Sequence, residues 1–145
     1  MIGRESYCLS FDMKSELIYP SCNIETIRDK RGGIFTWLPD EPIVEFNLLY
    51  FTPQATRGNH HHPHFNEYFI VVEGSGAMVY IDTETKEKHI LHMSVGSCVK
   101  NPMGVSHAFY AITPCTTMAF LTKRWDLSEP PIIHDHVTTE NRVES

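Results

Sequence analysis

The sequence predicts an all-β fold built as a sandwich or a barrel, and three observations support this prediction. Runs rich in β-branched and aromatic residues, such as IVEFNLLYF at 43–51, are short and end at turn residues. These runs recur roughly every 8–12 residues, which is the spacing typical of sandwiches and barrels. Helical periodicity is confined to 13–19, where a single turn could form.

Turn residues separate the expected strands along the chain. Gly74 and Gly76 flank a hairpin turn, where a positive φ costs little only for glycine. Pro102 and Gly104 form a tight turn just ahead of His107. The expected strands, in chain order, are 34–37, 43–51, 68–72, 77–81, 88–92, 98–100, 107–112 and 116–121.

The length of the chain, 145 residues, suits one domain with a single core. We expect an N-terminal arm at 1–22, a barrel at 23–126 and a C-terminal tail at 127–145. The arm is expected to pack either on this barrel or on a second subunit. The tail is expected to be irregular because prolines interrupt it, and disordered from residue 137.

Composition and charge narrow the partners and the compartment. A net charge of −6 disfavours nucleic acid and anionic membranes as partners, because both need a basic face. No run of about 18 apolar residues exists, so no transmembrane helix is expected. The first residues lack the apolar segment of a signal peptide, and none of the four cysteines lies in a C-x-x-C pair. We therefore expect a cytoplasmic protein with reduced thiols.

Histidines cluster in one internal segment and carry the strongest chemical signal. Because side chains alternate along a strand, His60 and His62 share one face and His61 takes the other. Glu67 can face the same interior, and His107 can complete a site of three histidines and one carboxylate if its strand lies close by. Each residue taken singly is more often structural, so the joint spacing carries the hypothesis. Such ligands suit zinc, iron, nickel, manganese or copper, and leave coordination positions open for water or substrate.

The spacing of these residues resembles the two sequence motifs of the RmlC-like cupin superfamily. That resemblance implies a double-stranded β-helix, or jelly-roll, barrel. It also implies that His60, His62, Glu67 and His107 bind one divalent transition metal, such as zinc, nickel, manganese or iron. Gln54 and Ala111 depart from the family pattern, at positions that are not ligands in the family. The two segments read His60-x-His62-x4-Glu67-x6-Gly74 and Gly96-x5-Pro102-x-Gly104-x2-His107.

Individual sequence segments narrow the resemblance to cupins that modify nucleotide-linked sugars. The segments 56–62 and 67–76 are similar to the cupin domain of bifunctional capsular-polysaccharide enzymes. The segments 102–109 and 125–130 are similar to the dTDP-4-keto-sugar epimerase and ketoisomerase group. The resemblance implies an isomerase or epimerase that acts on a nucleotide-linked 4-keto sugar in surface polysaccharide biosynthesis. Two alternatives remain open: a metal-dependent iron dioxygenase or other cupin oxidoreductase, and a non-catalytic sugar-binding or sensory cupin.

Such chemistry needs a base to remove a proton next to the ketone. His64 and Lys100 are the candidate catalytic residues, and Lys100 is expected to point inward or to lie at the rim. Arg31 and Arg57 are the candidate substrate-binding residues, because guanidinium groups form charge-assisted bonds to a diphosphate.

A homodimer is the expected assembly. The side chains of Tyr68, Ile70 and Val72 have the parity of the outer face, where an apolar row fits a buried dimer surface. The alternative is that this row packs under the N-terminal arm.

Overall fold

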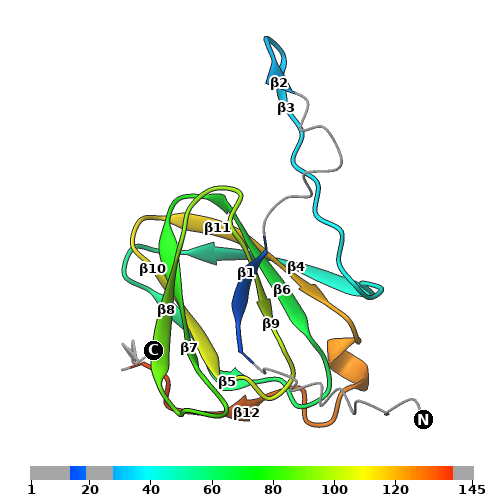
Figure 1. Ribbon diagram of the computed structural model, residues 1–145, viewed down its shortest axis with the longest axis vertical. Helices are drawn as coiled ribbons and strands as arrows, with labels where there is room; N and C mark the ends of the chain where they lie inside the picture. Colours follow the sequence, from blue (N-terminus) through cyan, green and yellow to red (C-terminus); the bar gives the residue numbers. More distant parts are fainter. Residues whose placement is uncertain (1–13, 19–27, 139–145) are drawn as a thin grey trace, which may run out of the picture.

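The computed structural model describes residues 14–18 and 28–138, whose strands form two antiparallel sheets that face each other (Figure 1). The all-β jelly-roll prediction is confirmed. The first sheet has the order β1 (Glu16–Ile18), β9 (Cys98–Asn101), β6 (Glu67–Glu73), β11 (Cys115–Leu121) and β4 (Glu45–Phe51). The second has the order β12 (Ile133–His134), β5 (Thr56–His61), β10 (His107–Ala111), β7 (Gly76–Ile81) and β8 (Lys88–Met93).

Strand β11 shows how the sequence pattern produces these layers. Its burial alternates strictly, so that Cys115, Thr117, Ala119 and Leu121 are buried while the residues between them are half-buried. The period of two turns one row of side chains to the barrel interior and the other row to the outside of the sheet. Leu121 pairs with Glu67 on one side and with Glu45 on the other, so these three residues share the inner face.

The barrel interior is apolar at one end and polar at the other. At the apolar end the ring of Phe109, from the second sheet, lies 5.0 Å from that of Phe51 and 4.9 Å from that of Phe69, both from the first sheet. At the polar end, Glu67 of β6 pairs in register with Asn101 of β9. Packed aromatic side chains therefore close one end, while charged and amide groups gather at the other.

A hairpin of β2 (Arg28–Asp29) and β3 (Gly32–Gly33) stands away from the barrel (Figure 1). The strand predicted at 34–37 is wrong, because this segment pairs with no described strand and runs on from the hairpin as extended chain. Its aromatic residues instead cover part of the outer face of the first sheet, in a groove they share with Tyr68 and Ile70. Trp37 is half-buried there, whereas Ile34 and Phe35 are 56% and 59% exposed, so this apolar run marks neither a strand nor a fully buried segment.

The C-terminal tail returns to the barrel. After a 3₁₀ turn, η1 (Trp125–Leu127), it adds β12 to the edge of β5. The Asn59 side-chain oxygen then accepts the backbone N–H groups of Val137 and Thr138 at 3.0 and 2.8 Å. The disorder predicted from residue 137 is therefore wrong for these two residues. Residues 139–145 lie outside the described part of the chain.

Most of the predicted arm at 1–22 also lies outside the described residues, as do Cys8 and Cys22. The part that is described, 14–18, pairs with β9 of its own barrel through β1. Cys98 and Cys115 are buried free thiols, and burial raises the pKa of Cys98 to about 12. No helix in the described part of the chain is long and apolar enough to span a bilayer.

Candidate metal centre

Three histidines converge at the polar end of the barrel. His60 lies on β5, His62 follows that strand directly, and His107 begins β10. The strands β5 and β10 are neighbours, and His107 pairs with His60 in the register. One side-chain nitrogen from each histidine lies within 4.8 Å of the other two. The structure thus brings His107 to His60 and His62, which lie 47 and 45 positions earlier in the sequence.

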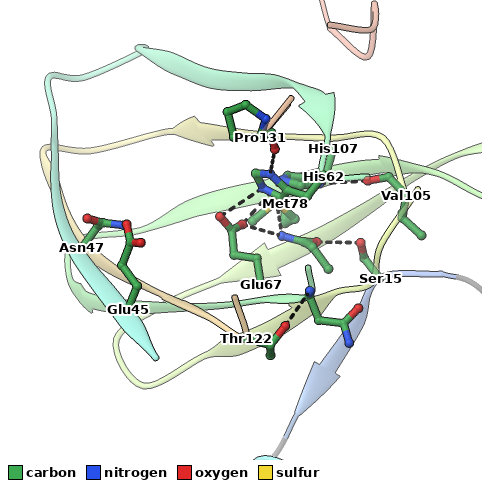
Figure 2. Close-up of polar contacts among 12 residues, drawn as sticks. Ser15, Glu45, Asn47, His62, Glu67, Met78, Val105, His107, Thr122 and Pro131 are labelled. Atoms are coloured by element: carbon green, nitrogen blue, oxygen red, sulfur yellow. Dashed lines mark hydrogen bonds and ion pairs between the residues drawn. The ribbon is translucent and has the colours of Figure 1, made fainter. Parts of the chain in front are cut away.

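Glu67 reaches the same point from the opposite sheet. Its Oε2 atom lies 3.4 Å from His62 Nε2, and its Oε1 atom lies 3.4 Å from His107 Nε2 (Figure 2). The Oε1 atom also accepts a hydrogen bond of 3.1 Å from Asn101 Nδ2. All four residues that the cupin resemblance names as ligands therefore meet in one cluster.

Backbone carbonyls orient two of the imidazoles. The Nδ1 atom of His62 lies 3.2 Å from the Pro131 carbonyl, and the Nδ1 atom of His107 lies 2.9 Å from the Val105 carbonyl. A carbonyl only accepts, so Nδ1 carries the proton of each neutral ring and Nε2 keeps its lone pair. His62 Nε2 is buried and makes no hydrogen bond, since its contact with Glu67 lacks hydrogen-bond geometry. This arrangement is typical of metal-binding histidines.

The electrostatics of the cluster favour a neutral His60 ring and a Glu67 carboxylate anion. Burial, followed by the positive fields of His107 and His62, lowers the pKa of His60 to about 3. Burial raises the pKa of Glu67, but its contacts with His107 and His62 outweigh burial and hold that pKa well below the ordinary value. Metal binding requires deprotonated ligands, and both of these shifts favour that state at His60 and Glu67.

The donor set and its spacing fit a divalent transition metal. Metal–ligand distances of about 2.0–2.2 Å place two ligand atoms of one ion roughly 3–4 Å apart. The 3.4 Å contacts of Glu67 lie within this range, and the three histidine nitrogens are near it. The buried Nε2 lone pair of His62, which has no partner among the described residues, would gain one from such an ion.

A cavity of about 490 Å³ opens onto the cluster. Arg57 lines it, and the Arg57 guanidinium carbon lies 5.9 Å from the centre of the Phe51 ring. Trp125 forms another part of the wall, and its ring lies 6.1 Å from that of His62. The cavity therefore combines a cation, an aromatic wall and the histidine cluster, on a scale that suits a small molecule.

The other residues predicted to act on substrate lie elsewhere. Arg31 lies in the turn of the β2–β3 hairpin, and its guanidinium donates to both carboxylate oxygens of Asp29. His64 is exposed, and its Nε2 atom lies 3.0 Å from the Glu129 carbonyl oxygen. Neither residue lines the cavity beside the histidines.

Of the two positions predicted for Lys100, inward or at the rim, the inward one is wrong. Lys100 pairs with Tyr68 on the outer face of the sheet, with its Nζ atom 5.7 Å from the centre of the Tyr68 ring and 3.8 Å from Glu41 Oε2. The next residue, Asn101, takes the inward place beside Glu67. The pairing register decides between them, because a shift of one residue moves a side chain to the opposite face.

Sequence reasoning missed two residues of the site, Asn101 and Trp125. Asn101 has the parity of the buried Val99, so its position on the inner face could have been inferred from the alternation of β9. Trp125 lies in a short turn whose position depends on Glu45, which accepts its backbone N–H at 2.8 Å. No local sequence pattern signals that contact.

Comparison with known proteins gives one family match. The model of the family described as polysaccharide biosynthesis C-terminal domain matches residues 27–130. A search of curated protein sequences finds no match.

Solved structures share the fold. The capsular polysaccharide assembling protein CapF from Staphylococcus aureus is 25% identical with a TM-score of 0.58, over 76% of this chain and 32% of CapF. The 3'-monoepimerase ChmJ from Streptomyces bikiniensis, in complex with dTDP-quinovose, is 20% identical with a TM-score of 0.71, over 83% of this chain and 68% of ChmJ. The sugar 3,4-ketoisomerase QdtA from Thermoanaerobacterium thermosaccharolyticum, in complex with TDP, is 18% identical with a TM-score of 0.66, over 84% and 88% of the two chains.

These matches confirm the cupin fold that the two motifs imply. This chain spans about one third of CapF, and its likeness to ChmJ and QdtA, at lower identity, concerns the fold.

Proposed function

This chain belongs to the polysaccharide biosynthesis C-terminal domain family, and on that premise we propose that it is a metal-binding isomerase or epimerase. The proposed substrate is a nucleotide-linked 4-keto sugar used in surface polysaccharide biosynthesis. The observation that carries the proposal is the cavity that Arg57 lines together with His60, His62 and Glu67, three members of the cluster that His107 completes.

The protein groups of the cavity suit the parts of such a substrate. Arg57 supplies a permanent cation for a diphosphate, and the exposed side chain is able to form bidentate bonds. Trp125 supplies an apolar wall against which a sugar ring can pack. A divalent metal bound by the cluster would act as a Lewis acid toward the ketone oxygen and stabilise an enolate.

The names of the structural neighbours support the same class of substrate. ChmJ is described with dTDP-quinovose and QdtA with TDP, and both are named for sugar epimerase or ketoisomerase activity. A 4-keto sugar has acidic protons at C3 and C5, and both reactions begin by removing one of them. The proposed function therefore predicts exchange of these protons with solvent.

Deuterium exchange tests the proposed function. The metal-loaded protein, incubated with a panel of dTDP- and UDP-4-keto-6-deoxyhexoses in D₂O, is expected to replace the C3 or C5 proton of at least one sugar with deuterium. The disappearance of that proton signal in the NMR spectrum measures the rate. His107→Ala should slow exchange by about 100-fold or more, because loss of the metal removes several kcal/mol of enolate stabilisation.

The control for this experiment is His64→Ala, which lies outside the cavity and should exchange at the rate of the unaltered protein. Sugar binding without exchange across the panel would contradict an epimerase and favour a binding or sensory cupin. Bound iron with oxygen uptake would instead favour the oxidoreductase alternative.

We also propose a homodimer, but through a different row of residues from the one the sequence suggests. The outer-face residues Tyr68 and Ile70 are covered in part by segment 35–39 of their own chain. The edge strand β4 instead exposes Phe46, Leu48 and Tyr50, which are 67%, 50% and 71% exposed. An exposed apolar row on an unpaired edge strand is suited to pair with the same strand of a second copy about a twofold axis.

Charge placed on this row should separate the dimer. Leu48→Glu is expected to give a monomer in sedimentation velocity at concentrations where the unaltered protein is a dimer, because a dimer would have to bury an unpaired carboxylate. Ile90→Glu is the matched control, since Ile90 is 57% exposed on the edge strand β8 of the other sheet. If Ile90→Glu dissociates the dimer while Leu48→Glu does not, the interface lies on the other sheet. An unaltered protein that is monomeric would refute the dimer.

A further inference from the structure

A chain of three buried polar side chains leads from the N-terminal segment to Glu67 (Figure 2). The Ser15 hydroxyl donates to Asn101 Oδ1 at 2.6 Å, and Asn101 Nδ2 donates to Glu67 Oε1 at 3.1 Å. Asn101 is fully buried at 0% exposure, and Ser15 is 2% exposed. These residues come from three separate parts of the chain that the first sheet places side by side.

We propose that Ser15 and Asn101 are positioning residues that hold the Glu67 carboxylate in its orientation for metal binding. Ser15, which directly precedes β1, would then be part of the metal centre. This inference rests on the proposed metal site and adds to it residues that the ligand motifs do not contain.

Glu67 determines which way the Asn101 amide faces, because a carboxylate only accepts and therefore requires the amide nitrogen. Ser15 completes this arrangement, since its hydroxyl donates to the Oδ1 atom at the other end of the amide. The same nitrogen lies 3.8 Å from Met78 Sδ, so both sides of the amide have partners. The opposite orientation would place Oδ1 against the carboxylate and leave buried groups unpaired, which is costly in the interior.

Asn101 in turn limits how the Glu67 carboxylate can rotate. Its hydrogen bond holds Oε1, while the same carboxylate contacts His107 through Oε1 and His62 through Oε2. Without this bond the carboxylate could turn away from the histidines. Hydrogen-bond partners of this kind orient metal ligands, and their loss typically weakens metal binding by about 10- to 100-fold.

The register explains why these residues meet. Glu16 pairs with Lys100 on the outer face, so the preceding residue, Ser15, falls beside Asn101 on the inner face. A strand that served only to cover the core would be expected to bury apolar groups here, as Leu17 does next to the core. A hydroxyl and an amide, both buried and directed at a carboxylate, are better explained by a role at the site.

Metal titration of variants tests this Ser15–Asn101–Glu67 chain of hydrogen bonds, called the relay below. The unaltered protein, Asn101→Ala and Ser15→Ala are purified without chelator and titrated with Zn²⁺ against a chromophoric chelator. We expect both variants to bind Zn²⁺ about 10- to 100-fold more weakly. Ser15→Thr keeps the hydroxyl and should restore most of the affinity. The visible spectrum of bound Co²⁺ reports the ligand geometry and should change in Asn101→Ala.

Thr117→Val is the matched control for the relay. Thr117 is fully buried on the inner face of the same sheet, and its hydroxyl has no hydrogen-bond partner in the described part of the chain. This variant should bind Zn²⁺ as the unaltered protein does. Melting of the metal-free proteins distinguishes a purely structural role from a positioning role. A purely structural role would lower the melting temperature but leave the Zn²⁺ affinity and Co²⁺ spectrum of the folded protein unchanged.

The outcomes distinguish the relay from the metal site on which it rests. If the unaltered protein binds Zn²⁺ and both variants bind it equally well with the same Co²⁺ spectrum, the relay is refuted and the metal site stands. If the unaltered protein binds neither Zn²⁺ nor Co²⁺, the proposed metal site and the relay are both refuted. Ser15→Ala removes a single oxygen atom, so it decides the question if Asn101→Ala does not fold.

Discussion

His107→Ala is expected to bind Zn²⁺ about 10²- to 10³-fold more weakly than the unaltered protein. Structural zinc sites with four ligands contribute about 10–16 kcal/mol, or roughly 3–4 kcal/mol for each ligand. His107 contributes one of the three nitrogens that lie within 4.8 Å of one another, and its Nδ1 contact with the Val105 carbonyl fixes the ring. Removing the imidazole therefore removes a ligand that is already oriented.

Two measurements check this prediction. Competition with a chromophoric chelator gives the affinity, and elemental analysis of protein purified without chelator gives the metal content. About one equivalent is expected in the unaltered protein and much less in the variant. Iron in that analysis would strengthen the oxidoreductase alternative, whereas zinc, nickel or manganese would favour the sugar isomerase.

The matched control for His107→Ala is His64→Ala. His64 belongs to the same histidine-rich segment, yet it is exposed and contacts the Glu129 carbonyl instead of the cluster. Equal loss of metal in both variants would contradict the proposed ligand set. Retention of metal by His107→Ala would leave His107 with a structural role at the start of β10.

Gly74→Ala is expected to destabilise the fold by about 3 kcal/mol or more. Gly74 has a φ of +83°, a conformation that residues with a side chain rarely adopt. A Cβ atom there would also lie 2.1 Å from the Pro114 carbonyl oxygen, which is backbone and cannot turn aside. The hairpin between β6 and β7 would have to move, and with it the packing against the start of β11.

Gly96→Ala separates the two contributions to this loss. Gly96 has a similar φ of +89°, but a Cβ atom there would meet nothing within 4 Å. It should therefore show the conformational cost alone, about 1 kcal/mol. The free energies of unfolding of the two variants, measured with urea on metal-free protein, give the steric contribution by difference. Equal losses would show that the backbone near Pro114 yields to the added atom.

Gly76 illustrates how a glycine can be required for a second reason. Its φ is not positive, contrary to the reasoning that both glycines serve the conformation of the turn. A Cβ atom at this position would lie 2.4 Å from the Tyr110 carbonyl oxygen and 2.5 Å from the ring of Phe109. Gly76 is thus needed for close approach of strands β7 and β10, which the sequence alone does not distinguish from a need for a positive φ.

Much of the candidate metal centre could be predicted from the sequence, because the rule that places its residues, alternation along a strand, is local. Alternation along a strand places His60 and His62 on one face, and in the structure both reach the cluster. The parity of Glu67 with Phe69 and Val71 places its carboxylate in the interior, where it contacts the histidines. The all-β class followed from short runs of β-branched and aromatic residues and from regularly spaced turns.

The tertiary structure alone decided which residues surround that cluster. Alternation along β9 puts Lys100 and Asn101 on opposite faces, but only the register between β6 and β9 sets Asn101 opposite Glu67 and Lys100 opposite Tyr68. Ser15 reaches Asn101 across 86 positions of sequence. No local pattern predicts that contact, because pairing between remote strands depends on the packing of the whole barrel.

At the cavity, too, the sequence determined local features and left open the contacts between remote segments. The identities and parities of the four clustered residues are properties of short segments, so the sequence determined them. Trp125 lines the cavity because Glu45 holds its backbone, and the tail stays in place because Asn59 binds Val137 and Thr138. These contacts join remote segments through single side chains, and only the folded barrel brings such segments within hydrogen-bonding distance.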